Sequence, residues 1–255
     1  MIRVLFNKKG GVGKSSLTVN LAAIAANNGL KTLIIDLDTQ CNSTQYLDLL
    51  QENQENTIFE LFDQTISFHI KRKDTFEFCH KTQQPNLFII PGSCNLAELE
   101  SKLDSRHKIY KLRESLQQLK PHFDRIYIDT PPALNFYTLS ALIGADSCII
   151  PIDCDDFSRQ GLYSLQLEIE EIKQDHNEKL KIEGIIANQF MAQAKLPLQI
   201  IDELKKEQFY VLNTFIPQSI KMKESHQKKK PLINYAPKHK LTQALVALHQ
   251  ELEAQ

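Results

Sequence analysis

A short run rich in lysine, glycine and serine begins at the seventh residue and has the composition of a phosphate-binding loop. Its ten residues are Asn7, Lys8, Lys9, Gly10, Gly11, Val12, Gly13, Lys14, Ser15 and Ser16. Glycines let backbone N–H groups approach phosphate oxygens because no Cβ stands in the way. Lys14 is placed to reach the terminal phosphates of a nucleotide, and the hydroxyl of Ser15 is placed to bind Mg²⁺. The run therefore predicts a nucleotide site that uses magnesium.

Three aspartates stand at the ends of apolar segments. Asp36 and Asp38 close the run that begins at Leu33, and Asp129 closes the run that begins at Ile126. Alternate residues of a strand face the same side, so Asp36 and Asp38 are expected together at the carboxyl edge of a sheet, where open α/β sheets bind ligands. Carboxylates at that edge can hold Mg²⁺ and orient an attacking water. The residues alone leave open the alternative that these acids only cap the next helix.

Short β-branched segments alternate with longer amphipathic ones along the chain, and this alternation predicts how the acids and the loop are positioned. The expected strands are 2–6, 32–36, 87–91, 126–129, 147–152, 182–187 and 211–216. The expected helices include 14–27, 96–103, 108–119 and 162–172. Several strands are apolar on consecutive residues, which is typical of strands covered on both faces. We therefore expect a doubly wound, mostly parallel sheet with helices on both faces.

Composition places the chain among ordinary globular proteins. It has 255 residues, of which 42% are hydrophobic and 24% charged, and its formal net charge is −1. A protein that coats nucleic acid through bulk positive charge is therefore excluded, although a local basic patch is not. Five cysteines without C-x-x-C spacing favour a reducing, cytoplasmic setting over a disulfide framework or a zinc site. We expect a single domain over residues 1–255, with residues 51–86 as an insertion or surface excursion.

The loop departs from the ordinary G-x-x-x-x-G-K-[ST] pattern, because the first glycine of that pattern would fall at Lys8. What stands here is K-G-G-x-G-K-S, with a second lysine at Lys9. In this respect the chain resembles the deviant Walker A ATPases of the ParA/MinD superfamily. The resemblance implies a P-loop NTPase fold, with ATP and Mg²⁺ as ligands. It also implies a nucleotide-sandwich homodimer in which Lys9 reaches the phosphates bound by the other subunit, so that Lys9, Lys14 and Asp38 would be the catalytic residues.

Two further segments are similar to the switches of that superfamily. The run from Asp36 to Gln40 follows the pattern D-x-D-P-Q, except that Thr39 replaces the proline and loosens the loop. By resemblance, Asp38 positions the hydrolytic water and Asp36 serves the magnesium shell. The run Asp129-Thr130-Pro131-Pro132 is similar to the second switch, so the expected magnesium residues are Ser15, Asp36 and Asp129.

The resemblance also covers the later part of the chain. Residues 184–188 look like the strand whose asparagine contacts the adenine, and 215–217 look like the loop that closes over the base. It implies that Asn188 and Pro217 bind the nucleotide together with Asp129 and residues 9–16.

A cluster of seven lysines lies within residues 221–240, against a single acid, Glu224. The lysines expected to contact DNA are Lys221, Lys223, Lys228, Lys229 and Lys230. Such a face is sufficient for non-specific, salt-dependent duplex binding, although a charge run is often only solvated surface. By resemblance to the ParA branch, it would bind DNA once the ATP dimer has formed, and the protein would be associated with the nucleoid.

The sequence thus favours a slow, partner-stimulated ATPase switch that positions or segregates DNA or protein cargo, with a ParB-like protein or a cargo adaptor as partner. One alternative is a MinD-like ATPase that cycles on membranes. It is disfavoured because the C-terminal residues 248–255 lack the lysine and arginine that anionic lipids attract. Two others are a P-loop amide ligase or synthetase, against which Lys9 argues, and a purely structural nucleotide-binding module, against which Asp38 and Asp129 argue.

Overall fold

A computed structural model describes residues 1–50, 55–67, 72–154 and 156–255. Within this part of the chain one seven-stranded sheet has the order β3-β4-β2-β5-β1-β6-β7. Its strands are β1 Ile2–Leu5, β2 Thr32–Asp36, β3 His80–Lys81, β4 Leu87–Ile90, β5 Arg125–Asp129, β6 Ser147–Ile152 and β7 Lys181–Ala187. All neighbouring strands pair in parallel except β3 and β4, which are antiparallel. The predicted doubly wound, mostly parallel sheet is confirmed.

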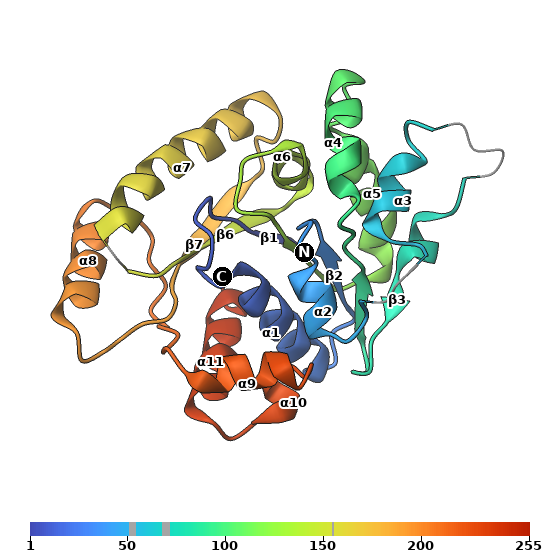
Figure 1. The fold of residues 1–255 in the computed structure, drawn as a ribbon. Helices are drawn as coiled ribbons and strands as arrows, with labels where there is room; N and C mark the ends of the chain where they lie inside the picture. Colours follow the sequence, from blue (N-terminus) through green and yellow to red (C-terminus); the bar gives the residue numbers. More distant parts are fainter. Residues whose placement is uncertain (51–54, 68–71, 155) are drawn as a thin grey trace.

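Helices cover both faces of this sheet (Figure 1). One face carries α1 Lys14–Asn27, α2 Asn42–Tyr46, α9 Ile220–Gln227, α10 Leu232–Tyr235 and α11 Lys240–Glu253. The other carries α3 Ile58–Asp63, α4 Leu96–Ser105, α5 Lys111–Leu119, α6 Phe136–Gly144, α7 Asp156–Asp175 and α8 Lys195–Lys206. Two short 3₁₀ helices, η1 Thr75–Phe78 and η2 Lys120–His122, connect elements on this second side.

Consecutive apolar residues in the central strands serve two separate cores. In β2, Leu33 and Ile35 pack into the core under α4 and α5, while Ile34 between them packs into the core under α1. In β5, Ile126 and Tyr127 divide between the two cores in the same way. Because successive side chains of a strand point to opposite faces, a strand buried on both faces must be apolar throughout.

Residues 211–216 do not form the strand that the sequence predicts. Val211 makes only an isolated bridge to Ile185 of β7. The N–H groups of Leu212 and Ile216 donate to the carbonyls of Ile185 and Ala187 in β7, at 3.0 and 2.9 Å. Between them, the N–H of Thr214 donates instead to the Glu251 carboxylate of α11 at 2.9 Å, which interrupts the ladder. The segment therefore runs beside β7 without continuing the sheet.

The described part of residues 51–86 is more integrated than the predicted surface excursion. Helix α3 buries Leu61 and Phe62 in the same core as α4 and α5. A capping box starts this helix, because the Thr57 hydroxyl accepts from a backbone N–H and the Glu60 carboxylate accepts from the Thr57 N–H at 2.8 Å. This segment thus contributes to the core, and β3 adds an antiparallel edge to the sheet.

A buried ionic network fastens α11 to the sheet. Arg3 of β1 is almost fully buried, and its guanidinium donates to Glu183 of β7 at 2.7 Å and to Glu253 of α11 at 2.6 Å. Arg125 of β5 donates to the same Glu253 carboxylate at 2.9 Å. Burial alone would raise the pKa of Glu253, but the hydrogen bonds from Arg125 and Arg3 outweigh it and lower the pKa to about 2.

Candidate nucleotide-binding site

The glycine-rich loop connects β1 to α1 and is clamped against the end of β7. Gly13 precedes the first residue of α1 with φ +91°, a left-handed conformation that glycine adopts without strain. A Cβ at this position would lie 2.3 Å from Nδ2 of Asn188. That amide donates to the carbonyl of Val12 at 2.7 Å. The close approach between loop and strand therefore requires glycine at residue 13.

Lys14 lies folded against the loop that precedes it. Its ammonium donates to the carbonyls of Asn7 and Lys9, at 3.0 and 3.2 Å. Burial lowers the pKa of Lys14, while the nearby carboxylates of Asp129 and Asp38 raise it. The loop carbonyls therefore hold the Lys14 ammonium within the electrostatic influence of Asp129 and Asp38.

Asp36 is fully buried and supports α2. One carboxylate oxygen accepts from the backbone N–H of Thr44 at 2.9 Å and from its hydroxyl at 2.7 Å. A Cβ on Gly92, which follows β4, would lie 3.0 Å from this carboxyl group. Burial and the charge of Asp129 raise the pKa of Asp36, and the Thr44 hydrogen bonds oppose them. Asp36 does not line the cavity described below, so a place in a magnesium shell stays a prediction.

Asp129 combines the features expected of a cation ligand. It ends β5, is fully buried, and its Oδ2 accepts from the Ser43 hydroxyl at 2.7 Å. Among the residues that the structure describes, no donor partners its Oδ1. Burial raises the pKa of Asp129, while the nearby hydroxyls of Ser15 and Ser43 lower it. A buried carboxylate oxygen without a partner, beside a serine hydroxyl, fits an oxygen-loving cation such as Mg²⁺.

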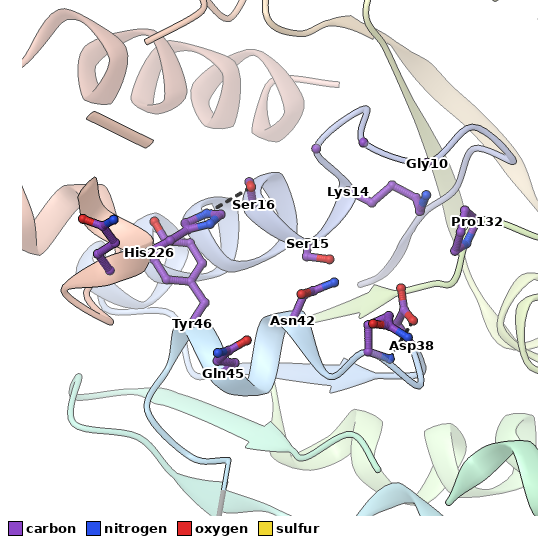
Figure 2. A pocket seen from close by; sticks show the side chains of 14 residues that line it. Gly10, Lys14, Ser15, Ser16, Asp38, Asn42, Gln45, Tyr46, Pro132 and His226 are labelled. Atoms are coloured by element: carbon purple, nitrogen blue, oxygen red, sulfur yellow. Dashed lines mark hydrogen bonds between the residues drawn. The ribbon is translucent and has the colours of Figure 1, made fainter. Parts of the chain in front are cut away.

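A cavity of about 550 Å³ brings Lys14, Ser15 and Asp38 together (Figure 2), whereas neither Asp36 nor Asp129 lines it. Its lining comes from the loop and α1, from the β2–α2 segment, from the turn after β5 and from α9. The lining residues are Gly10, Gly11, Gly13, Lys14, Ser15, Ser16, Asp38, Gln40, Asn42, Gln45, Tyr46, Pro132, His226 and Gln227. Asp38 accepts from the backbone N–H of Gln40 at 2.9 Å, which fixes its carboxylate at the start of α2.

A second cavity of about 320 Å³ adjoins the first through four shared lining residues, Gly11, Gly13, Ser16 and His226. Asn188 and Pro217, the two residues predicted at a base, both line it. Backbone hydrogen bonds hold this region together, since Phe190 donates to Ile216 at 2.8 Å. The two cavities therefore meet at the first turn of α1.

Lys9 stands on the outer side of the loop. Its ammonium lies 2.8 Å from the Asp153 carboxylate just after β6, and both side chains are partly exposed. Lys9 does not line either cavity of its own subunit. Its ammonium therefore faces the end of β6 and not either cavity.

The predicted DNA-contacting lysines lie on α9 and in the segment after it. Lys221 pairs with Glu224 at 2.6 Å, and Lys229 pairs with Asp48 at 2.6 Å. The other three, Lys223, Lys228 and Lys230, are exposed.

Several cavity residues were not anticipated from the sequence. Tyr46, Gln45 and Asn42 of α2 line the larger cavity, and His226 of α9 lines both. No local pattern distinguishes His226 from the other seven histidines. Its position becomes visible only when α9 packs beside α1.

Comparison with known proteins identifies the family. The family model described as "AAA domain" matches residues 1–182. The chromosome partitioning protein ParA of Myxococcus xanthus is 35% identical over 251 residues, which span 96% of this chain and 85% of the relative. The sporulation initiation inhibitor protein Soj of Bacillus subtilis is 31% identical over 255 residues, which span 99% of this chain and 98% of the relative.

Solved structures share the fold. A McdA protein of Cyanothece in complex with ATP has a TM-score of 0.85 at 23% identity, covering 99% of this chain and 96% of that one. Cobyrinic acid a,c-diamide synthase of Mycobacterium smegmatis with ADP and magnesium has a TM-score of 0.83 at 22% identity, covering 98% and 92%. None of the helices in the described ranges is both long and apolar enough to cross a membrane.

The match to the family model and the identity to the ParA and Soj proteins show the family. The chain belongs to the ParA/MinD superfamily of P-loop ATPases, close to its ParA and Soj members.

Proposed function

We propose that the protein is a Mg²⁺-dependent ATPase switch that dimerises on ATP and binds DNA without sequence preference in that state. The observation that carries this proposal is the cavity whose lining includes Lys14, Ser15 and Asp38. It joins a phosphate loop to a carboxylate that is able to orient water, and such a pair is what phosphoryl transfer to water requires. The likeness to partitioning ATPases supports a role in positioning DNA or cargo.

In this proposal, each residue in and beside the cavity has a separate role in hydrolysis. Backbone N–H groups of the loop and the start of α1 bind the phosphates, because a helix N-terminus carries partial positive charge. The Lys14 ammonium stabilises the charge that develops on the terminal phosphate oxygens. Asp38 orients a water toward the γ-phosphorus, and its placement by the Gln40 N–H limits its movement. Ser15 and Asp129 would hold Mg²⁺, which when bound neutralises phosphate charge.

Dimerisation gives Lys9 its role in this proposal. Its ammonium lies on the rim of the loop, where it pairs with Asp153 in its own subunit. In a two-fold pair, the same ammonium would approach the phosphates of the partner subunit. Hydrolysis would remove the group that both lysines contact, and the pair would separate.

The lysines of α9 and of residues 228–230 form the proposed DNA surface. Phosphate contacts by lysine do not depend on the base sequence, and they weaken steeply as salt rises. The logarithm of the binding constant falls with the logarithm of the salt concentration, with a slope of about −0.9 for each phosphate contacted. A dimer presents two such surfaces to one DNA, which raises the overall affinity. Because ATP would form the dimer, DNA binding would depend on ATP. A ParB-like protein or a cargo adaptor would stimulate turnover, and the protein would then be found on the nucleoid.

The fold alone does not select this function, because an amide synthase shares it at a TM-score of 0.83. Sequence relatives support it over the amide synthase, since the ParA and Soj proteins are 35% and 31% identical over nearly the whole chain. A MinD-like membrane cycle is set aside if the protein with ATP fails to pellet with anionic liposomes.

The proposal is tested by DNA binding with ATP, with ADP and without nucleotide, at two salt concentrations. The key variant is the triple change Lys228→Glu, Lys229→Glu and Lys230→Glu. Its matched control carries Lys195→Glu, Lys205→Glu and Lys206→Glu, which change the same charge on α8. We expect ATP-dependent binding that only the first variant loses, with basal ATPase activity retained in both. Equal loss in both variants, or binding that ignores ATP, would refute the proposal.

A further inference from the structure

His226 lies at the junction of the two cavities. It belongs to the last turn of α9, and its Nε2 lies 3.1 Å from Oγ of Ser16 in the first turn of α1 (Figure 2). Both cavities include His226 and Ser16 in their linings. A nucleotide with its phosphates on the loop and its base beside Asn188 must therefore pass this pair of side chains.

The position of the imidazole is fixed by its neighbours. The ring of Tyr46 packs against it with centroids 4.1 Å apart and planes at 55°. The Tyr46 hydroxyl in turn forms a 2.5 Å hydrogen bond with Ser225, the residue before His226. Asn20 of α1 donates to the same hydroxyl at 3.1 Å. These contacts link α1, α2 and α9 beside the imidazole, which is exposed and lines both cavities.

Backbone hydrogen bonds connect His226 and Ser225 to the lysines that follow α9. The N–H of Lys229 donates to the carbonyl of His226 at 3.0 Å, and the N–H of Lys230 donates to that of Ser225 at 3.1 Å. The turn after α9 is therefore built on the residues that contact Tyr46 and Ser16. A displacement of His226 would move the backbone of the lysine segment, residues 228–230, with it.

We propose that His226 contacts the bound nucleotide between its phosphates and its base, exchanging its Ser16 partner for the nucleotide, and thereby positions the lysine segment according to nucleotide occupancy. The inference rests on the proposed function only in requiring that a nucleotide binds. An imidazole N–H is able to donate to a phosphate or ribose oxygen, and a hydrogen bond of this kind to a charged acceptor changes affinity by roughly tenfold or more. The DNA surface would then sense the nucleotide within one subunit, before any dimer forms.

The test is calorimetric titration of the whole protein with Mg²⁺-ADP. His226→Ala should weaken ADP binding about tenfold, and His226→Gln, whose amide also donates, should recover most of that loss. The control is His122→Ala, an exposed histidine on η2 that contacts Phe76. ADP binding by His226→Ala equal to that of the parent would overturn the contact. Absence of ADP binding by the parent would instead overturn the proposed function, and this inference with it.

A second readout separates positioning from mere structural support. Hydrogen exchange of the backbone amides in residues 221–230 should slow when ADP is added to the parent and to His122→Ala. In His226→Ala, saturated with ADP, the same amides should exchange as fast as without nucleotide. Should ADP protect them equally in His226→Ala, the link to the lysine segment is wrong. His226→Gln provides the same comparison in a protein that keeps a polar side chain against Tyr46.

Discussion

Replacing Gly13 by alanine should disable the phosphate loop and destabilise the protein for two independent reasons. Alanine at φ +91° costs about 1–2 kcal/mol relative to glycine. The new Cβ would also fall 2.3 Å from Nδ2 of Asn188, so that this side chain must leave its hydrogen bond to Val12. Loss of that buried bond costs about 1–3 kcal/mol. We therefore expect the free energy of unfolding to fall by about 3 kcal/mol.

Two companion variants make the reasoning specific. Gly10→Ala is the matched control, because a Cβ on Gly10 would meet no atom within 4 Å and the φ of this residue is not positive. It should change the unfolding free energy by less than about 0.5 kcal/mol. Asn188→Ala combined with Gly13→Ala removes the collision and leaves only the backbone strain. The double variant should therefore be more stable than the sum of the single changes by about 1–2 kcal/mol.

Urea unfolding followed by circular dichroism gives the stability of all five proteins: the parent, Gly13→Ala, Gly10→Ala, Asn188→Ala and the double variant. Titration with Mg²⁺-ADP measures whether the loop still binds nucleotide. Gly13→Ala should bind ADP too weakly to detect at the concentrations that saturate the parent. The reasoning is refuted if Gly13→Ala is as stable as Gly10→Ala. Strict additivity with Asn188→Ala would refute the proposed collision while leaving the strain argument intact.

Two further predictions concern charge. Lys14→Ala should abolish Mg²⁺-ADP binding in the same titration, and retained binding would contradict the assignment of the loop. Arg3 and Arg125 hold the pKa of the Glu253 carboxylate at about 2 against an ordinary value of 4.5, a difference that corresponds to about 3 kcal/mol. Because this carboxylate is partly exposed and solvent screens it, Glu253→Gln should lower the free energy of unfolding by about 2 kcal/mol at neutral pH. A depressed carboxyl pKa stabilises the fold above pH 4.5 and loses its effect as the pH falls toward 2. The difference between parent and variant should therefore shrink in urea unfolding at pH 3, and a difference independent of pH would contradict the linkage.

The sequence was sufficient to predict the sheet and the loop because both depend on local pattern. Apolar runs ending in Asp36 and Asp129 are the second and fifth strands, and they pair with each other so that the two acids stand side by side in register. The helix predicted over residues 14–27 has those bounds. Apolar residues at 241, 245, 248 and 252 have the spacing of one helix face, and in α11 all four leucines are buried.

What the sequence did not predict depends on contacts between distant segments. Residues 211–216 are apolar enough for a strand, but Glu251, far along the chain, accepts the Thr214 N–H that a continuous ladder with β7 would need. The capping box at Thr57 and Glu60 was a signal for α3 that the polar surroundings of residues 51–86 obscured. His226 had no such signal, since its neighbours Ser16 and Tyr46 come from other helices.

The central claim is that ATP joins two copies of this chain through the loop and Lys9. The direct measurement is the mass in solution of Asp38→Ala, with Mg²⁺ and ATP, by light scattering after gel filtration. The 29.3 kDa chain should double its mass with ATP, remain a monomer with ADP, and remain a monomer with ATP when Lys9→Ala is added. A monomer with saturating ATP, or a dimer that forms equally well without Lys9, would contradict the account.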